Sequence, residues 1–185
     1  GGDRLFFMWA ARVVGMEIYG FTGGPFQTNT YVIAEGRRAL IVDPGMDAAG
    51  KVLEHDLDYE AIVLTHGHID HTRDAGTLAA ELDIPVYIHP ADKFMLDSGE
   101  GVSPQAQELF DAAHMTPISD LRELHDGETV ELIGHTFELK HAPGHSPGCV
   151  MIVSEDFALT GDVLFAGAIG RTDLPHSDPN AMQKS

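Results

Sequence analysis

A short apolar run, Ala-Ile-Val-Leu at residues 61–64, most constrains the fold of this chain. It has no polar residue on either face, which is typical of a parallel strand buried on both sides. Thr65 ends the run, and a histidine cluster begins at once with His66. Sites in α/β proteins form beyond the carboxyl ends of such strands. We therefore expect an α/β domain with a functional site directly after this strand.

The segments around this run alternate between strand-like and helix-like patterns. A helix is expected over residues 74–82 and a strand over 86–88, which indicates βα layering. Shorter helices are expected near 48–57 and 105–113, and residues 91–125 are the best candidate for a mobile cover over a site. Further strands are expected at 30–33, 39–42, 129–133, 136–140, 149–153 and 157–160. Without repeats or a linker, the pattern predicts one domain.

The histidine cluster offers four potential metal ligands within six residues. They are His66, His68, Asp70 and His71, and neutral imidazole and carboxylate are good ligands for zinc and similar divalent ions. His66 and His68 are two residues apart, so their side chains point the same way in an extended chain. Asp70 and His71 follow where the chain should turn into a helix, so they can face a second ion. Gly67 leaves room for close backbone approach.

Two later motifs supply further ligand candidates. His145 lies in a loop with prolines and glycines on both sides, between two expected strands. Asp162 follows an apolar strand and a glycine, at a strand end. Each motif is weak alone, since an aspartate at a strand end is more often a turn residue. In this order after the first cluster, we include both residues among the expected ligands.

The run from His66 to His71 resembles the signature of the metallo-β-lactamase superfamily. The segments around His145 and Asp162 match the next two motifs of that family in the right order, so the resemblance covers roughly residues 16–178. It implies a four-layer αβ/βα sandwich with the site at one edge of two facing sheets. It also implies two divalent ions. In similar enzymes the first is held by the positions of His66, His68 and His145, the second by those of Asp70 and His71, and the position of Asp162 bridges them.

The chain departs from the family pattern at its end. Similar enzymes carry a further histidine late in the fold, whereas His176 is the only histidine after Asp162 and its surroundings do not match. The chain also stops at Ser185, before the expected final strand and helix, so we expect the C-terminal part of the fold to be missing. Met16 is a plausible native start. Residues 1–15 are then an N-terminal extension that need not be native, and residues 16–185 are a single, incomplete domain.

Two ions that share a carboxylate can supply a metal-bound hydroxide near neutral pH, which predicts a hydrolase. Zinc is the expected metal, with iron and manganese open. Asp70 is the catalytic candidate, because it can orient the hydroxide or take its proton. Asp43 ends an apolar strand and can hydrogen-bond a ligand imidazole from behind. A plain turn aspartate is an equally good interpretation of Asp43.

The substrate is expected to be a small thioester. The segments at 161–165 and 170–175 resemble the glyoxalase II-like (hydroxyacylglutathione hydrolase-like) branch, which hydrolyses thioesters such as S-lactoylglutathione. Arg171 can pair with a substrate carboxylate, and an internal salt bridge with Asp173 is the alternative. The thiol carrier stays open, because the helical domain that grips glutathione in full-length glyoxalase II is absent from this sequence.

Two other hypotheses fit the same ligands. Persulfide dioxygenases share the fold and the first motif. The resemblance to them implies a single iron, held at the positions of His66, His145 and Asp162. A truncated metal-binding protein without activity is the third hypothesis. Metal content separates the first two, because about two zinc-like ions favour the hydrolase and one iron favours the dioxygenase.

The amino-acid composition limits the kinds of molecule that this protein is expected to bind. Lys and Arg total 11 and Asp and Glu total 29, so the formal charge is 11 − 29 = −18, which argues against nucleic acid and anionic membranes. No apolar stretch is long enough to span a bilayer. Cys149, the single cysteine, excludes a disulfide framework and fits a buried thiol in the cytoplasm. A small-molecule substrate is the expected partner, and the oligomeric state is left open.

Overall fold

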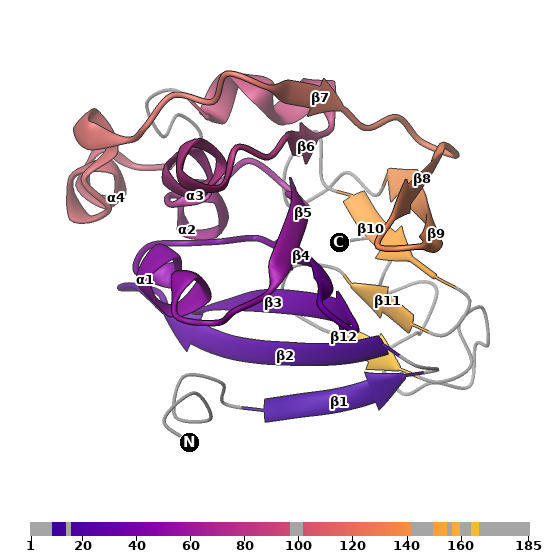
Figure 1. Cartoon of the computed structure of the whole chain (residues 1–185). Helices are drawn as coiled ribbons and strands as arrows, with labels where there is room; N and C mark the ends of the chain where they lie inside the picture. Colours follow the sequence, from indigo (N-terminus) through magenta and orange to yellow (C-terminus); the bar gives the residue numbers. More distant parts are fainter. Residues whose placement is uncertain are drawn as a thin grey trace.

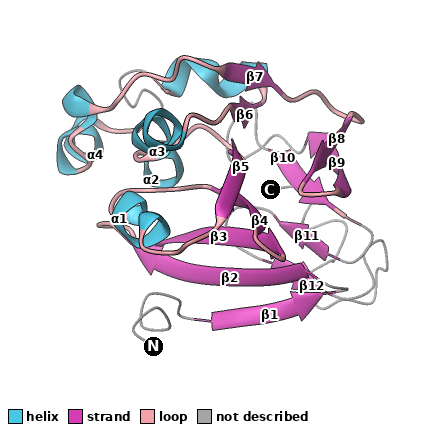
Figure 2. Ribbon diagram, viewed as in Figure 1, coloured by secondary structure: helices cyan, strands magenta, loops and turns pink. Residues whose placement is uncertain are grey.

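Two β-sheets face each other in this protein, and helices cover the outer side of the first (Figures 1 and 2). The structure is a computed structural model that describes residues 9–13, 16–96, 102–141, 150–154, 157–159 and 164–166. The first sheet contains, in spatial order, β1 (Trp9–Val13), β2 (Met16–Gly23), β3 (Thr28–Glu35), β4 (Arg38–Val42), β5 (Asp58–Val63), β6 (Val86–Ile88) and β7 (Leu121–Glu123). The second contains β12 (Leu164–Ala166), β11 (Phe157–Leu159), β10 (Val150–Val153), β9 (His135–His141) and β8 (Thr129–Leu132).

The first sheet changes from antiparallel to parallel at β4. Strands β1 to β4 pair antiparallel, whereas β4, β5, β6 and β7 pair parallel to one another. Parallel strands need crossover connections, and helices α1 (Ala48–Leu53) and α3 (Ala75–Leu82) lie within two of them. The expected strand at 61–64 lies in β5, with Leu64 just beyond its end. The carboxyl ends of β4 and β5 are therefore neighbours, and the chain that follows both is available to build a site.

Two apolar cores hold the layers together, one on each face of the first sheet. β3 shows why, because its residues alternate between them: Tyr31 and Ile33 pack between the sheets, and Val32 and Ala34 pack under the helices. On β5, likewise, Val63 faces the second sheet and Ile62 the helices. Burial on both faces explains the continuous apolar run in the sequence.

The layers agree with the expected α/β sandwich as far as the structure describes them. All pairings in the second sheet are antiparallel. The described helices lie on the side of the first sheet that faces away from the second (Figure 2). Helix, sheet and sheet are thus three of the four expected layers. No helix found within the described ranges has the length and apolarity to cross a membrane.

Several boundaries differ from the sequence-based expectations. Residues 9–13, assigned to the N-terminal extension, form β1 and pair with β2 from Trp9–Gly20 to Val13–Met16. The helix expected at 48–57 ends at Leu53. The segment expected as one cover is divided into the 3-10 helix η2 (Pro90–Met95), helix α4 (Pro104–Leu109), the 3-10 helix η3 (Ala112–His114) and β7. Met95 is 1% exposed, so η2 is part of the packed fold.

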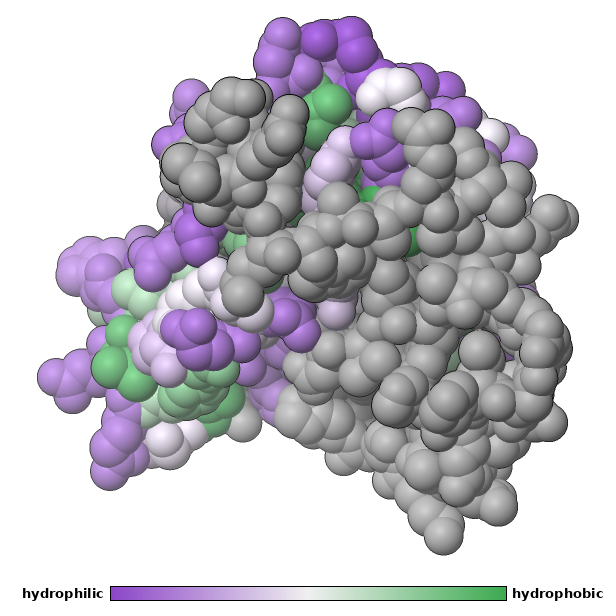
Figure 3. Space-filling view, turned by 90° about the horizontal axis from the view of Figure 1, so that it is seen from below, coloured by the Kyte–Doolittle hydropathy of each residue, from purple (hydrophilic) through white to green (hydrophobic). Residues whose placement is uncertain are grey.

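Few large apolar side chains reach the described surface. Phe26, Leu53, Phe94 and Leu109 are the exposed ones. Figure 3 shows hydrophobic residues gathered in a limited area at the left of one face, with hydrophilic residues around it. Phe26 is half exposed and packs edge-to-face on buried Phe110, with ring centroids 4.8 Å apart.

Candidate metal centre

The histidine cluster lies where the chain leaves β5 and enters the short helix α2 (Ile69–Thr72). His68 occupies the residue before the helix with an extended backbone, and Asp70 and His71 lie within the helix. The expected change from extended chain to helix between His68 and Asp70 is therefore present. His66 and His71 are each 2% exposed, and His68 and Asp70 are partly buried.

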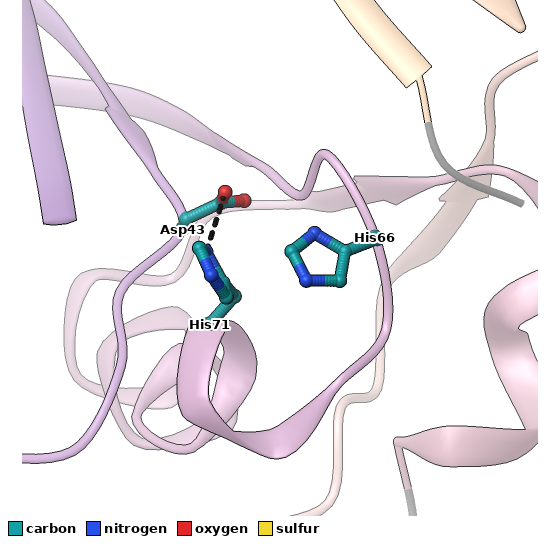
Figure 4. A group of neighbouring side chains, drawn as sticks. All are labelled: Asp43, His66 and His71. Atoms are coloured by element: carbon teal, nitrogen blue, oxygen red, sulfur yellow. Dashed lines mark hydrogen bonds and ion pairs between the residues drawn. The ribbon is translucent and has the colours of Figure 1, made fainter. Parts of the chain in front are cut away.

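The side chains of the cluster converge. The ring centroids of His66 and His71 are 4.1 Å apart, and those of His66 and His68 are 5.2 Å apart. Potential ligand atoms of His66, His68 and Asp70 all lie within 4.8 Å of one another. The same holds for Asp43, His66 and His71, which come from the loop after β4, the loop after β5 and helix α2 (Figure 4). The fold thus brings Asp43 to residues more than twenty positions away in the sequence.

Asp43 organises the neighbouring polar groups from a fully buried position. It is 0% exposed, with a φ of 54°, a left-handed conformation that Asp and Asn adopt more readily than most residues. Its Oδ1 accepts the Thr65 backbone N–H at 2.7 Å. Its Oδ2 accepts the Thr65 hydroxyl and lies 3.0 Å from Nδ1 of His71. Thr30 holds the backbone from the sheet, because its hydroxyl donates to the Asp43 carbonyl at 2.9 Å.

These hydrogen bonds determine the tautomers of two histidines. An ionised carboxylate only accepts, so Nδ1 of His71 carries the proton that points to Asp43. The single hydroxyl proton of Thr65 is also given to Asp43, so Thr65 Oγ1 accepts from His66 Nδ1, which is 3.1 Å away. In the neutral form of both rings, Nε2 therefore carries the lone pair. A lone pair on Nε2 is what a metal ion requires.

Asp43 is better suited to orienting ligands than to binding an ion itself. Its oxygens are among those close enough to His66 and His71 to share an ion with them. Both oxygens, however, already accept hydrogen bonds, from Thr65 and His71. A carboxylate that fixes an imidazole from behind is the usual partner of a metal-bound histidine. The geometry therefore favours the orienting role.

The contact between Asp70 and His71 provides a test of whether the residues fit a cation. Asp70 Oδ2 lies 3.6 Å from His71 Nε2 and accepts the Thr28 hydroxyl at 3.3 Å. With neutral His71, two acceptor atoms face each other, an arrangement that a cation between them would stabilise. Two tetrahedral zinc ligands at about 2.1 Å from the ion are about 3.4 Å apart, close to this separation. Without a cation, a proton on Nε2 would satisfy both atoms, so metal binding would release it.

The loops that carry these residues pack closely on one another. A Cβ at Gly45 would lie 2.2 Å from the backbone oxygen of Asp70, so only glycine allows this approach. Asp74 N–H donates to the Pro44 carbonyl at 3.0 Å. The loop after β4 is therefore pressed against α2, which fixes Asp43 relative to Asp70 and His71.

The remaining sequence-based candidates, His145, Asp162 and Arg171, lie outside the described residues, as do Cys149 and His176. The ends of the segment that carries His145 are described. β9 ends at His141, and Val150, the first residue of β10, donates its N–H to the Thr65 carbonyl at 2.7 Å. That segment thus rejoins the described fold one residue from His66.

A second group of histidines lies beside the ends of β6, β7 and β9. The rings of His89 and His141 stack with centroids 4.1 Å apart, and His125 is 6.3 Å from His89. Burial lowers the pKa of His89, and the neighbouring His141 and His125 lower it further. Among the residues that the structure describes, this trio does not form a group with ligand atoms close enough to share an ion.

Sequence reasoning missed three threonines of this centre. Thr65 bridges Asp43 and His66, Thr28 contacts Asp70, and Thr30 donates to the Asp43 carbonyl. Thr65 lay beside the cluster but was interpreted only as the end of a strand. Thr28 and Thr30 precede Val32 and Ala34 on the same face of β3, so their polarity on an apolar face was a signal.

Similarity to known proteins supports the assignment of the fold. Residues 23–185 match the family model of the metallo-β-lactamase superfamily. The hydroxyacylglutathione hydrolase GloC of Haemophilus influenzae is 35% identical over 161 residues, which cover 83% of this chain and 74% of that protein. Two crystal structures are similar. BLEG-1, a B3 metallo-β-lactamase, has a TM-score of 0.66 and 32% identity over 89% of this chain and 81% of its own. TTHA1623 in a di-iron-bound form has a TM-score of 0.62 and 35% identity, over 88% of this chain and 81% of its own.

A helix–sheet–sheet fold with histidines and carboxylates gathered where β4 and β5 end defines an α/β protein with a candidate metal centre. This chain belongs to the metallo-β-lactamase superfamily.

Proposed function

We propose that this protein is a binuclear metal hydrolase that cleaves a small thioester of the S-lactoylglutathione type. The observation that carries the metal-dependent part is the convergence of His66, His71 and Asp70. Nδ1 of both histidines faces a hydrogen-bond partner, which supports Nε2 as the atom that would bind a metal ion, and Asp70 Oδ2 lies 3.6 Å from Nε2 of His71. The similarity to GloC, a hydroxyacylglutathione hydrolase, supports the thioester.

In this proposal, His66, His68 and His145 would hold one ion, Asp70 and His71 would hold the other, and Asp162 would contribute to both. Two zinc ions bound there would lower the pKa of a bound water and polarise the carbonyl of the substrate. Asp70 would orient the attacking water and take its proton, and the Thr28 hydroxyl donates to Asp70 Oδ2, which fixes that carboxylate. Asp43 and Thr65 keep the imidazoles in the binding tautomer.

Substrate recognition is assigned to Arg171. In a chain of formal charge −18, a cation near the site would attract a substrate carboxylate that the rest of the surface repels. The partner is accordingly a small thiol conjugate and not a nucleic acid. The cytoplasmic location stays a prediction.

The experiment combines metal analysis with substrate comparison. Protein purified without added metal should contain about two zinc-like ions per chain, and S-lactoylglutathione should be hydrolysed faster than a chromogenic cephalosporin. Arg171→Ala should raise KM more than it lowers kcat, because Arg171 binds substrate equally before and during the reaction. Faster turnover of the cephalosporin, the activity named for BLEG-1, would refute the thioester assignment.

A single-iron persulfide dioxygenase is the second candidate. The similar protein TTHA1623 in its di-iron-bound form supports iron as the metal, but with two ions and not one. The dioxygenase hypothesis predicts one iron per chain and oxygen consumption with a persulfide, without thioester turnover. Bound metal without either activity would instead indicate an inactive metal-binding protein.

A further inference from the structure

The peptide between the first two histidines of the cluster is held by a buried carboxylate that the proposed chemistry does not use. Gly67 lies between His66 and His68, and its backbone N–H donates to Oδ2 of Asp92 at 2.8 Å. Asp92 is 0% exposed. A buried carboxylate is costly unless it is hydrogen-bonded, so its position beside this loop needs an explanation.

The loop and the segment that carries Asp92 are in close backbone contact. A Cβ at Gly67 would lie 2.7 Å from the Asp92 backbone oxygen and 3.1 Å from Cβ of Met95. Glycine is therefore required for the approach. On the other side, the Thr72 hydroxyl lies 3.5 Å from the Gly67 carbonyl. The Gly67 peptide is thus enclosed between η2 and α2.

Asp92 is itself fixed by the short helix η2. His89 precedes that helix, and its Nδ1 accepts the Ala91 N–H at 3.0 Å, which caps the first turn. The Asp92 N–H donates to the His89 carbonyl at 3.0 Å. Met95 anchors the last turn in the fold. The Oδ2 atom of Asp92 is therefore held by a rigid element.

We propose that Asp92 is a positioning residue that aligns His66 and His68 for metal binding by fixing the peptide between them. This inference rests on the proposed metal-dependent function. His66 and His68 are the two neighbours of Gly67 in the chain. Rotation about the Gly67 backbone dihedrals therefore changes the direction of one imidazole relative to the other. A carboxylate acceptor holds the N–H more firmly than a neutral acceptor would.

Asp92→Ala and Asp92→Asn test the proposal by zinc titration calorimetry on the chelator-treated full chain. Removing the acceptor should weaken zinc binding about 10–100-fold, the range typical of lost partners behind metal ligands. Asn keeps an oxygen acceptor but loses the charge, so it should weaken zinc binding less, about 3–10-fold. Hydrogen exchange of the Gly67 amide should accelerate in the same order.

Asp74 provides the matched control. It is also a buried aspartate, 8% exposed, and it accepts a backbone amide, that of Ala49, at 2.9 Å. Asp74→Ala keeps the backbone N–H that holds Pro44 and removes only side-chain contacts, among them those with Ala49 and Arg73. It should lower the thermal stability of the metal-free protein but change zinc affinity less than about threefold, because these side-chain contacts do not lie behind a ligand. This comparison separates positioning from a general loss of stability.

The outcomes are decisive in each case. Wild-type zinc affinity in Asp92→Ala, or a loss no larger than in Asp74→Ala, would overturn the proposal. If Asp92→Ala does not fold, Asp92→Asn decides, and wild-type zinc affinity with unchanged Gly67 exchange would overturn it. A wild-type protein that binds zinc but does not cleave S-lactoylglutathione would refute the thioester function. The zinc titrations would still test the positioning role of Asp92 in that case.

Discussion

Asp43→Asn tests the tautomer argument, because the substitution keeps size and shape while it replaces an acceptor with a donor. Asn tolerates the φ of 54° at this position. Its remaining oxygen can still accept the Thr65 N–H, as Oδ1 does now at 2.7 Å. Its NH2 group takes the place of Oδ2, where it meets the donors of His71 and the Thr65 hydroxyl.

The rings can respond by moving the proton from Nδ1 to Nε2. Nδ1 of His71 then accepts from the Asn amide, and the Thr65 hydroxyl turns to donate to His66. Hydrogen bonds to charged groups contribute about 1.5–3 kcal/mol each. Because the neutral network replaces most of this, we expect folding to lose only about 1–2 kcal/mol, or about 2–8 °C in Tm for a chain of this size.

Zinc binding should suffer more than folding. Both Nε2 atoms would carry hydrogen, so binding must reverse two tautomers and break the new bonds. A cost of about 3 kcal/mol corresponds to a loss of about 100-fold in affinity. Zinc titration calorimetry and thermal unfolding of the metal-free protein measure the two quantities separately.

Asp74→Asn is the control for this substitution, since it also neutralises a buried aspartate that accepts a backbone amide. It should leave zinc affinity within about threefold of wild type, because Asp74 does not contact a proposed ligand ring. Zinc affinity of Asp43→Asn equal to that of the wild type would show that Asp43 does not set the tautomers, and the reasoning would fail.

Three further predictions follow from neighbouring contacts. Thr65→Val removes the hydroxyl between Asp43 and His66 and should weaken zinc binding about tenfold; an unchanged calorimetric titration would contradict it. Gly67→Ala places a Cβ 2.7 Å from the backbone oxygen of Asp92 and should lower the free energy of unfolding by about 1–3 kcal/mol in chemical denaturation. Wild-type stability of this variant would show that the loop can move away freely. The lowered pKa of His89 means that protonation favours the unfolded chain, so stability falls as pH drops through about 6.5 and the cap on η2 is lost. His89→Asn keeps a capping oxygen without titrating, so its Tm should fall about 2–4 °C less than that of the wild type between pH 7 and 5; equal slopes would exclude His89 as the cause.

The fold was predictable where burial leaves a pattern in the sequence. The run at 61–64 is apolar because β5 is covered on both faces, and this predicted an α/β domain with a site after the strand. β7 (Leu121–Glu123) carried no such signal, because it is a short edge strand with exposed residues. Edge strands are paired on one side only, so their sequences need not be apolar. β1 was missed for a different reason, because residues 1–15 were expected to be an extension outside the domain, whereas residues 9–13 pair with β2.

The site was predictable where its residues are adjacent in sequence. His66, His68, Asp70 and His71 form one cluster, and the described geometry brings them together. The bond from Asp92 to Gly67 spans twenty-five positions and depends on how η2 packs on the loop. No spacing rule connects those two residues. The role of Asp43 stayed open for the same reason, because only the packing of its loop against α2 brings it to His71.

The contacts behind the cluster explain why its ligands can be oriented before a metal arrives. Asp43 and Asp92 are both fully buried, and each accepts a backbone N–H from the loop at 64–68. One holds the loop before His66 and the other after it, so the direction of His66 is fixed from both sides. Ligands held in this way lose little conformational freedom on binding, and affinity gained through preorganisation requires no further contact with the ion. Substitutions at Asp43 and Asp92 should therefore act through the orientation of the rings, and the effects of the two should be non-additive because both hold the same imidazole.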